Sequence, residues 1–372
     1  MTAQLVYRRN SDGSLTRDEN NKLIARMIYR TREGQLAPWH ELGQAQDVWT
    51  IEEVKKFLQT SNKLHLLPVY AVGQIEEDGV VQDINLEVPE TQAVCWENEI
   101  IGKVGPDTSI LQNDDFFNSF KTWEEAGFPI ETAGYLDGGR KVWCQVNIHS
   151  GLEDTSAFEV RSNDKVLPYF FFAHGHCGNL SLTGSLNMTR VVCSNTLGMA
   201  LNESAGSSIK RKHRGNVIMK ASEIHKAVQA ALMDALSRIN QFKFLDSVKV
   251  SSGNLGNTAE DVVYKFVNAL AVKTEKAQKQ VITEALSQDF KPTKLHEDIA
   301  TRFSSGIGNL GMSFWDLFNA VTERHMHGIG NSLTGESDSD RVGRRLDSAW
   351  FGTGSLEIQR AFSVAMAMAK EA

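Results

Sequence analysis

Cysteine is scarce in this chain of 372 residues, which contains only 4 cysteines. They form no CxxC pair, and each lies in or beside an apolar run, where a reduced and packed thiol is the ordinary expectation. The four residues are Cys95, Cys144, Cys177 and Cys193. This pattern argues against a disulfide scaffold and favours a reducing cytosol.

Long apolar runs are also missing. Charge interrupts the amino-terminal segment, and no apolar stretch approaches the roughly 20 residues that a membrane-spanning helix needs. At 41% hydrophobic residues, the chain can still bury a substantial core. We therefore expect a soluble cytoplasmic protein that does not enter a membrane.

Most motifs of nucleotide-dependent and hydrolytic enzymes are absent. The sequence has no phosphate-binding GxxxxGKS/T loop, no GxSxG and no HExxH. Gly306 to Gly311 matches GxGxxG in letters, but it lies between predicted helices instead of after a strand, so it does not predict a dinucleotide site. We expect no cofactor, and neither a motor nor a dehydrogenase.

One turn contains several residues of the types that bind metal ions, but their spacing does not match that of a known metal site. His174, His176 and Cys177 lie together, and His213 or the pair at 325 and 327 are further candidates. No second CxxC or HxxxH half completes a structural zinc pattern. The sequence therefore predicts no metal site.

A thiol nucleophile is the enzymatic alternative that remains open. Cys193, His213 and Asn195 supply the residue types of a nucleophile, its base and an orienting amide. Cys193 ends an apolar strand pattern, however, where a thiol is usually packed and inert. We therefore expect no catalytic residues and keep a cysteine hydrolase as the lesser alternative.

The first 216 residues predict short strands and a few helices. Thr50 and Glu53 form a capping box that opens a helix through Gln59. The hairpin expected in residues 1–45 leads to Trp39-His40, either an aromatic plug or a ligand platform.

Strands at 65–72, 80–88 and 93–96, separated by Gly, Asp and Pro, are expected to form an antiparallel meander, and a helix at 113–126 should bury its aromatic residues. A hairpin is expected at 134–148, with its turn at Gly138-Gly139 and with Arg140 and Lys141 at the turn end of the second strand. Three consecutive phenylalanines, at 170–172, predict a central strand at 167–174 that is covered on both faces. Further strands are expected at 180–186 and 189–193, followed by a helix from 195 to 201 with Asn195 as its cap.

Beyond residue 216 the hydrophobic period changes from two to 3.6. Helices are predicted at 217–244, 257–272, 275–287, 294–303, 313–325 and 355–370. The fold class is therefore α+β, with a mainly antiparallel sheet in residues 1–216 and a mainly helical part in residues 217–372. No low-complexity linker separates the two parts, so we expect them to pack together.

Charge is distributed unevenly, although the net charge is −7. The segment from Lys210 to Lys226 contains six lysines and arginines and only one acid, Glu223, and lies at the start of a long predicted helix. Helix amino termini and guanidinium groups both suit phosphate oxygens. The candidate nucleic-acid-binding residues are Arg140, Lys141, Arg190, Lys210, Arg211, Lys212, His213, Arg214, Lys220, Arg344 and Arg345. A solvated loop, or an interface with an acidic surface, is the equally weighted alternative.

An acidic segment provides the opposite charge. Eight aspartates and glutamates lie between Glu76 and Glu99 without any lysine or arginine. A solvated sheet face is the commonest explanation, and the acids are not at metal-loop spacing.

Five segments resemble one known family. They begin at Trp39 (WHELG), Gly134 (GYLDGGRKVW), Thr189 (TRVVCSNTL), Lys212 (KHRGN) and Trp315 (WDLFNAVTE). In this order they look like the phage/plasmid-like protein family built on domain of unknown function 932, over roughly residues 38–365. The resemblance implies a gene of phages, plasmids or integrated islands, and therefore a bacterial host cytoplasm. It implies no agreed activity.

Together these observations predict a non-enzymatic nucleic-acid-binding protein, with single-stranded DNA as the first partner to consider. Single-strand binding or annealing in recombination or replication is the expected role. A phage virion or anti-defence interaction protein is the alternative. We also expect a homo-oligomer, in which the acidic segment of one copy meets the basic strip of the next, the strip being the cluster between Lys210 and Lys226. One strip alone offers few phosphate contacts.

Overall fold

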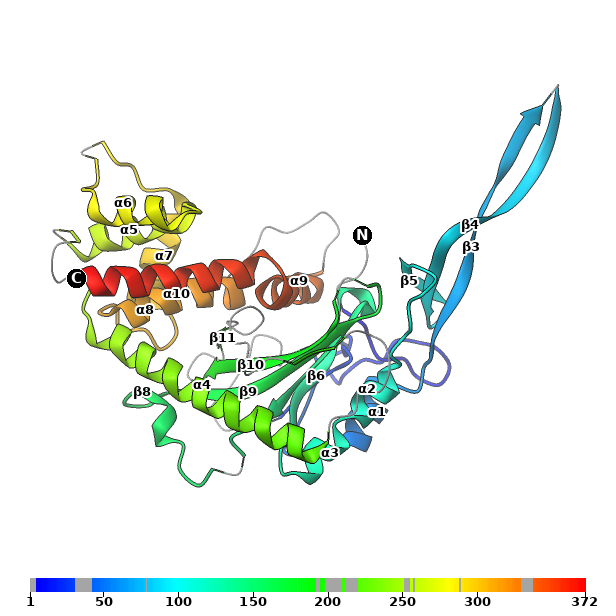
Figure 1. Ribbon diagram of the computed structural model, residues 1–372, viewed down its shortest axis with the longest axis horizontal. Coiled ribbons are helices and arrows are strands. Elements are labelled where there is room, and N and C mark those ends of the chain that lie inside the picture. Colours follow the sequence, from blue (N-terminus) through cyan, green and yellow to red (C-terminus); the bar gives the residue numbers. More distant parts are fainter. Residues whose placement is uncertain are drawn as a thin grey trace.

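The structure, a computed structural model, describes residues 5–30, 42–77, 79–150, 152–178, 180–191, 195–197, 209–211, 220–250, 255–256, 258–287, 289–328 and 337–372. The predicted α+β class is confirmed. In Figure 1 strands dominate the amino-terminal part and helices the carboxyl-terminal part. The predicted Trp39-His40, Cys193, Lys212, His213 and Arg214 lie outside the described residues.

The main sheet, as far as the chain is described, has nine strands. Its path runs β11, β10, β9, β7, β6, β1 and β2, while β12 pairs with β10 and β8 with β9. All pairings are antiparallel except that of β1 with β2. The strands are β1 (Met27–Arg30), β2 (Gln44–Gln46), β6 (Ile130–Leu136), β7 (Lys141–Asn147), β8 (Glu159–Arg161), β9 (Asp164–Gly175), β10 (Leu182–Arg190), β11 (Asn195–Leu197) and β12 (Ile209–Arg211).

Strand β9 is a central strand of the sheet, as its three consecutive phenylalanines predict. It lies between β7 and β10, and Phe170, Phe171 and Phe172 are all buried. Alternate side chains of a strand point to opposite faces, so both faces of β9 must be covered. Phe170 and Phe172 join the larger core with α4, while Phe171 packs against Trp350 of α9.

Two expectations near residue 190 were wrong. The strands expected at 180–186 and 189–193 are one strand, β10, because Asn187 continues the ladder opposite Tyr169 instead of forming a turn. Asn195 does not cap a helix, since Asn195–Leu197 form β11 against β10. Pairing with an existing strand edge outweighed the capping preference of asparagine.

Among its described residues, the helical part contains six helices near their predicted positions and one that was not predicted. Helix α4 crosses beneath the sheet in Figure 1, and α9 and α10 lie on its other side. The apolar core runs across residue 216, because Phe170 of the sheet and Phe242 of α4 belong to one cluster. The helices are α4 (Ala221–Ser247), α5 (Ala259–Ala271), α6 (Glu275–Thr283), α7 (Lys294–Ser305), α8 (Phe314–His327), α9 (Asp338–Phe351) and α10 (Thr353–Glu371). Of these α9 was not expected, since its apolar stripe is short. No helix among the described residues is long and apolar enough to cross a membrane.

The amino-terminal helices follow the expected chemistry with one difference. Thr50 and Glu53 cap α1 (Ile51–Leu58) reciprocally, as predicted. The helix expected at 113–126 is instead two short helices, α2 (Asn113–Asn118) and α3 (Lys121–Glu125), because the chain turns between them. Its aromatic residues are buried as expected, and Phe120 and Trp123 both contact Phe172.

The expected three-strand acidic segment is a long two-stranded arm on a short base. Strand β3 (Leu64–Glu77) pairs with β4 (Val80–Trp96), and β5 (Glu99–Val104) pairs only with the base of β4. In the sequence, Gly73 and Pro89 predict strand ends. Gly73 lies within the ladder, however, and Pro89 falls at the bulge opposite Pro68 and Tyr70, where no ladder hydrogen bond is needed. Figure 1 shows the arm projecting away from the rest of the molecule.

Candidate functional site

The described part of the basic strip is exposed. Lys210 lies on β12 opposite Thr183, and the backbone of Arg211 pairs opposite Leu182. Lys220 precedes the first turn of α4, where its backbone N–H donates to Glu223. Both lysine side chains are open to solvent and therefore accessible to an anion.

Arg140 and Lys141 lie at the turn between β6 and β7, as predicted, but they are already engaged. The Arg140 guanidinium donates to the backbone oxygen of Ile101 and lies 3.2 Å from Asp137. The Lys141 ammonium is 2.5 Å from Asp347 of α9. Burial raises the pKa of Asp347, and the hydrogen bond from Lys141 acts against that rise. These cations therefore tie the turn to β5 and α9.

The assignment of Arg190 to a contact surface is corrected. Its side chain is fully buried and donates to both carboxylate oxygens of Asp164. Nε lies 2.8 Å from Oδ1, and Nη2 lies 2.5 Å from Oδ2. It also donates to the carbonyl of Gly308 and the side chain of Asn309. Arginine suits such bidentate burial as well as it suits phosphate, so its position at a strand end did not distinguish the two roles.

The surroundings of Arg190 form an ion-pair network between the sheet and α8. Arg161 contacts Asp164, Asp246 and Asp316 at 2.8–3.3 Å, and the indole of Trp315 donates to Asp164 at 2.9 Å. The Gly308 carbonyl accepts from Arg161 as well as from Arg190. The glycine-rich segment at 306–311 thus directs a carbonyl toward cations, the opposite of what a phosphate loop requires.

A cationic cavity lies between α7, α8 and α9. Its volume is about 550 Å³. Four lysines and arginines and one carboxylate are among the described residues that line it. The lining consists of Lys294, Leu295, Asp298, Arg302, Arg324, His325, Gly328, Arg345 and Ser348. Helical spacing gathers these groups, since Asp298 and Arg302 share one face of α7, and Arg345 and Ser348 share one face of α9.

The single acid of the cationic cavity is shared. Asp298 lies 2.9 Å from Arg302 and 3.1 Å from Arg324, and Arg302 also contacts Glu323. His325 lies 3.0 Å from Glu357. A hydrogen bond from His325 lowers the pKa of that glutamate, with burial acting in the opposite direction. Glu323 and Glu357 offset part of the positive charge from outside the lining.

Arg345 carries a positive charge that carboxylates of the described residues do not neutralise. It donates to the backbone oxygen of Gly328. Burial lowers its pKa, and the nearby Arg341 and Arg344 lower it further. Among the described residues neither Arg345 nor Lys294 forms an ion pair with a carboxylate. An anion in the cavity would relieve this repulsion.

Of the cations that line this cavity, the sequence predicted a binding role for Arg345 but not for Lys294, Arg302 or Arg324. The other predicted residue of α9, Arg344, is not among the residues that line the cavity. The basic residues at the end of α8 were a usable signal, because cations favour helix carboxyl termini. Nothing local to the sequence showed that α7 and α9 both pack beside that end of α8.

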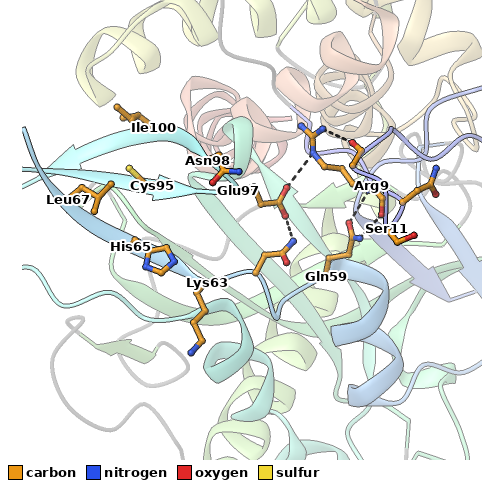
Figure 2. A pocket seen from close by; sticks show the side chains of 13 residues that line it. Arg9, Ser11, Gln59, Lys63, His65, Leu67, Cys95, Glu97, Asn98 and Ile100 are labelled. Atoms are coloured by element: carbon orange, nitrogen blue, oxygen red, sulfur yellow. Dashed lines mark hydrogen bonds and ion pairs between the residues drawn. The ribbon is translucent and has the colours of Figure 1, made fainter.

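A second cavity lies at the root of the arm, with a volume of about 1180 Å³. In Figure 2 Glu97 points toward Arg9, and His65 and Cys95 lie on the arm side. Glu97 also accepts from Asn62 and from the buried Arg26. Arg9 lies 3.6 Å from Glu97, whereas the Lys63 side chain points away from that carboxylate in Figure 2. The acid of this cavity is therefore already satisfied by donors of the chain itself.

The turn at 174–178 is packed. His176 contacts the amide oxygen of Asn113 at 3.0 Å, and the His174 ring lies against Phe116. Burial raises the pKa of the Cys177 thiol, which disfavours a reactive thiolate. No group of three or more histidine, cysteine or acidic side chains among the described residues is arranged to hold a metal ion.

Comparison with known proteins identifies a family and nothing narrower. No curated protein and no solved structure matches the chain. The family model described as Domain of unknown function (DUF932) matches residues 101–350, a range that contains β6 to β12, α4 to α8 and nearly all of α9. The chain therefore belongs to the DUF932 family.

Proposed function

We propose that this protein binds nucleic acid through its phosphates, with single-stranded DNA as the first ligand to test. The observation that carries the proposal is the cationic cavity, in which four lysines and arginines meet one carboxylate. Phosphate oxygens accept strong, paired hydrogen bonds from guanidinium groups. A backbone phosphate near Arg345 would supply the negative charge that its surroundings lack.

The exposed lysines of the basic strip support the same proposal. Lys210 and Lys220 face solvent, so they can meet a polyanion without first breaking an ion pair between described residues. The strip and the cavity are treated as separate contact sites, each with its own variants. Binding through both would serve strand annealing in the recombination or replication of a mobile element.

An electrophoretic titration against single- and double-stranded DNA and RNA tests the proposal. We expect the native protein to retard single strands and the double variant Lys294→Gln/Arg345→Gln to bind more weakly. The matched control is Lys276→Gln/Lys279→Gln on α6, which removes two exposed charges away from the cavity. No retardation by the native protein, or equal weakening in both variants, would contradict the proposal.

A second candidate function is protein interaction through the arm. Eight acids and no lysine or arginine between Glu76 and Glu99 suit a basic protein partner, as an anti-defence or virion role would require. Capture of a basic partner that is lost when the arm acids become glutamine, without any retardation of nucleic acid, would favour this function. The cysteine-hydrolase alternative rests on Cys193 and His213, which lie outside the described residues, so no observation in the described part of the chain favours it.

A further inference from the structure

The outer part of the arm, residues 70–77 and 80–87, is a ribbon of two strands and nothing more. Strand β5 pairs with β4 only between Gln92 and Trp96, so no third strand described here covers the ribbon. Nearly every side chain along it is exposed, and Figure 1 shows it extending clear of the body. Isolated two-stranded hairpins are marginal in water, so this ribbon lacks the support that a third layer gives.

The register divides the ribbon into two unlike faces. Directly paired residues of an antiparallel ladder share a face. The apolar face contains Ala71, Gly73, Ile75, Glu77, Val80, Gln82, Ile84 and Leu86. The acidic face contains Tyr70, Val72, Gln74, Glu76, Val81, Asp83, Asn85 and Glu87. Apart from Glu77 at the tip, the apolar face has no charge, whereas the other carries three acids.

On the apolar face, large side chains of β4 stand opposite small residues of β3. Leu86 stands opposite Ala71, and Ile84 stands opposite Gly73. A Cβ added at Gly73 would meet no atom within 4 Å, so the surface is open there. Strand β4 therefore forms a ridge beside a groove on β3, and Leu86, at 61% exposure, leaves much of that ridge in water.

We propose that this apolar face is a self-association surface, on which the arms of two copies pack face to face. The β4 ridge of each arm lies in the β3 groove of the other. Such a two-fold contact uses the same patch twice. It places the acids of both arms on the outer faces, where water screens their repulsion.

The match of large and small residues is the reason for choosing a second copy, because the ridge at Leu86 and the groove at Gly73 lie on one face and every copy offers both. No lysine or arginine lies between Lys63 and Lys103, so nucleic acid or an anionic lipid surface would meet no cation on the arm. Eight residues of a two-stranded ribbon cover roughly 26 Å by 10 Å. Since this is less than the ~800 Å² per partner of a standard interface, we expect a reversible dimer instead of a permanent one. This inference does not depend on nucleic-acid binding.

Sedimentation of the full chain across a dilution series tests the contact. We expect a concentration-dependent dimer that is lost in Leu86→Glu, because each contact would then bury a carboxylate. The matched control is Val81→Glu, which changes a valine of 59% exposure on the acidic face and should leave the dimer intact. A native protein that stays monomeric throughout would overturn the proposal, as would equal weakening by the two variants.

Two further variants identify the mode of packing. Gly73→Val adds apolar surface and fits the isolated chain, yet it fills the groove and should weaken the dimer. A tighter or unchanged dimer would overturn ridge-into-groove packing. Replacing Glu76, Asp83 and Glu87 with glutamine should preserve or strengthen the dimer. If it dissociates instead, the acidic face makes the contact with the basic strip and the apolar-face proposal is wrong.

Discussion

Arg190 and Arg345 are both arginines near an apparent basic surface, but their surroundings differ completely. Arg190 is buried against Asp164, a loop carbonyl and the Trp315 ring, and every part of this arrangement opposes its charge. Arg345 lines an open cavity beside two other arginines. The comparison shows that an arginine is a candidate for ligand binding when no carboxylate of the chain neutralises its charge. Its position in the sequence alone does not identify it as a binding residue.

The largest expected effect comes from removing the opposed cation. Arg190→Ala would leave Asp164 buried without its bidentate partner and should lower the free energy of unfolding by about 3–5 kcal/mol. Urea denaturation measures this change. A loss below about 1 kcal/mol would mean that the network around Asp164 contributes little to holding α8 on the sheet.

A smaller effect is expected from the neutral donor in the same network. Trp315→Phe keeps the ring contact with Phe242 but removes the hydrogen bond to Asp164, and should cost about 1–3 kcal/mol. Phe242→Leu is the companion variant, since it reduces ring packing without touching the carboxylate. Equal stability of Trp315→Phe and native protein would show that Asp164 needs only its arginines.

Acid should weaken this network. Burial raises the pKa of Asp316, but hydrogen bonds from Arg161 and from backbone N–H groups outweigh it, so the pKa lies below 3.8 in the folded protein. Because the folded-state pKa is depressed, the stability that Asp316 contributes is fully present above its unfolded pKa. It is lost as the pH falls through the folded value. Unfolding free energy measured against pH should fall in this acid range, and Asp316→Asn should flatten that fall.

The smallest stability effect should come from the unopposed cation. Arg345→Gln removes a charge that Arg341 and Arg344 repel, so thermal unfolding should place its stability within about 0.5 kcal/mol of native. A large loss of stability would mean that Arg345 is a structural residue like Arg190, and the comparison would fail.

Local signals predicted most of the fold. The Thr50 capping box, the Gly138-Gly139 turn and the three phenylalanines of β9 each placed an element, because each acts within a few residues. Predictions failed where distant partners decide the outcome. Asn195 became a strand by pairing with β10, and α9 depends on contacts such as that of Trp350 with Trp143.

The candidate site was less predictable for the same reason. A cluster of charges along the sequence identified Lys210 and Lys220 correctly as exposed. It could not show that Arg190 would find Asp164, or that Lys294 and Arg345 would line one cavity from helices about 50 residues apart in the chain. Tertiary structure determines which charged side chains form ion pairs, and the sequence composition does not contain this information.

The salt dependence of single-strand binding tests the central claim most directly. Each lost phosphate contact lowers the slope of log affinity against log salt by roughly 0.7. If the cationic cavity binds phosphate, Lys294→Gln/Arg345→Gln should weaken binding and flatten the slope by about 1.4, the sum of two such contacts. The Lys276→Gln/Lys279→Gln control should keep the native slope. A native slope in the cavity variant would contradict the account.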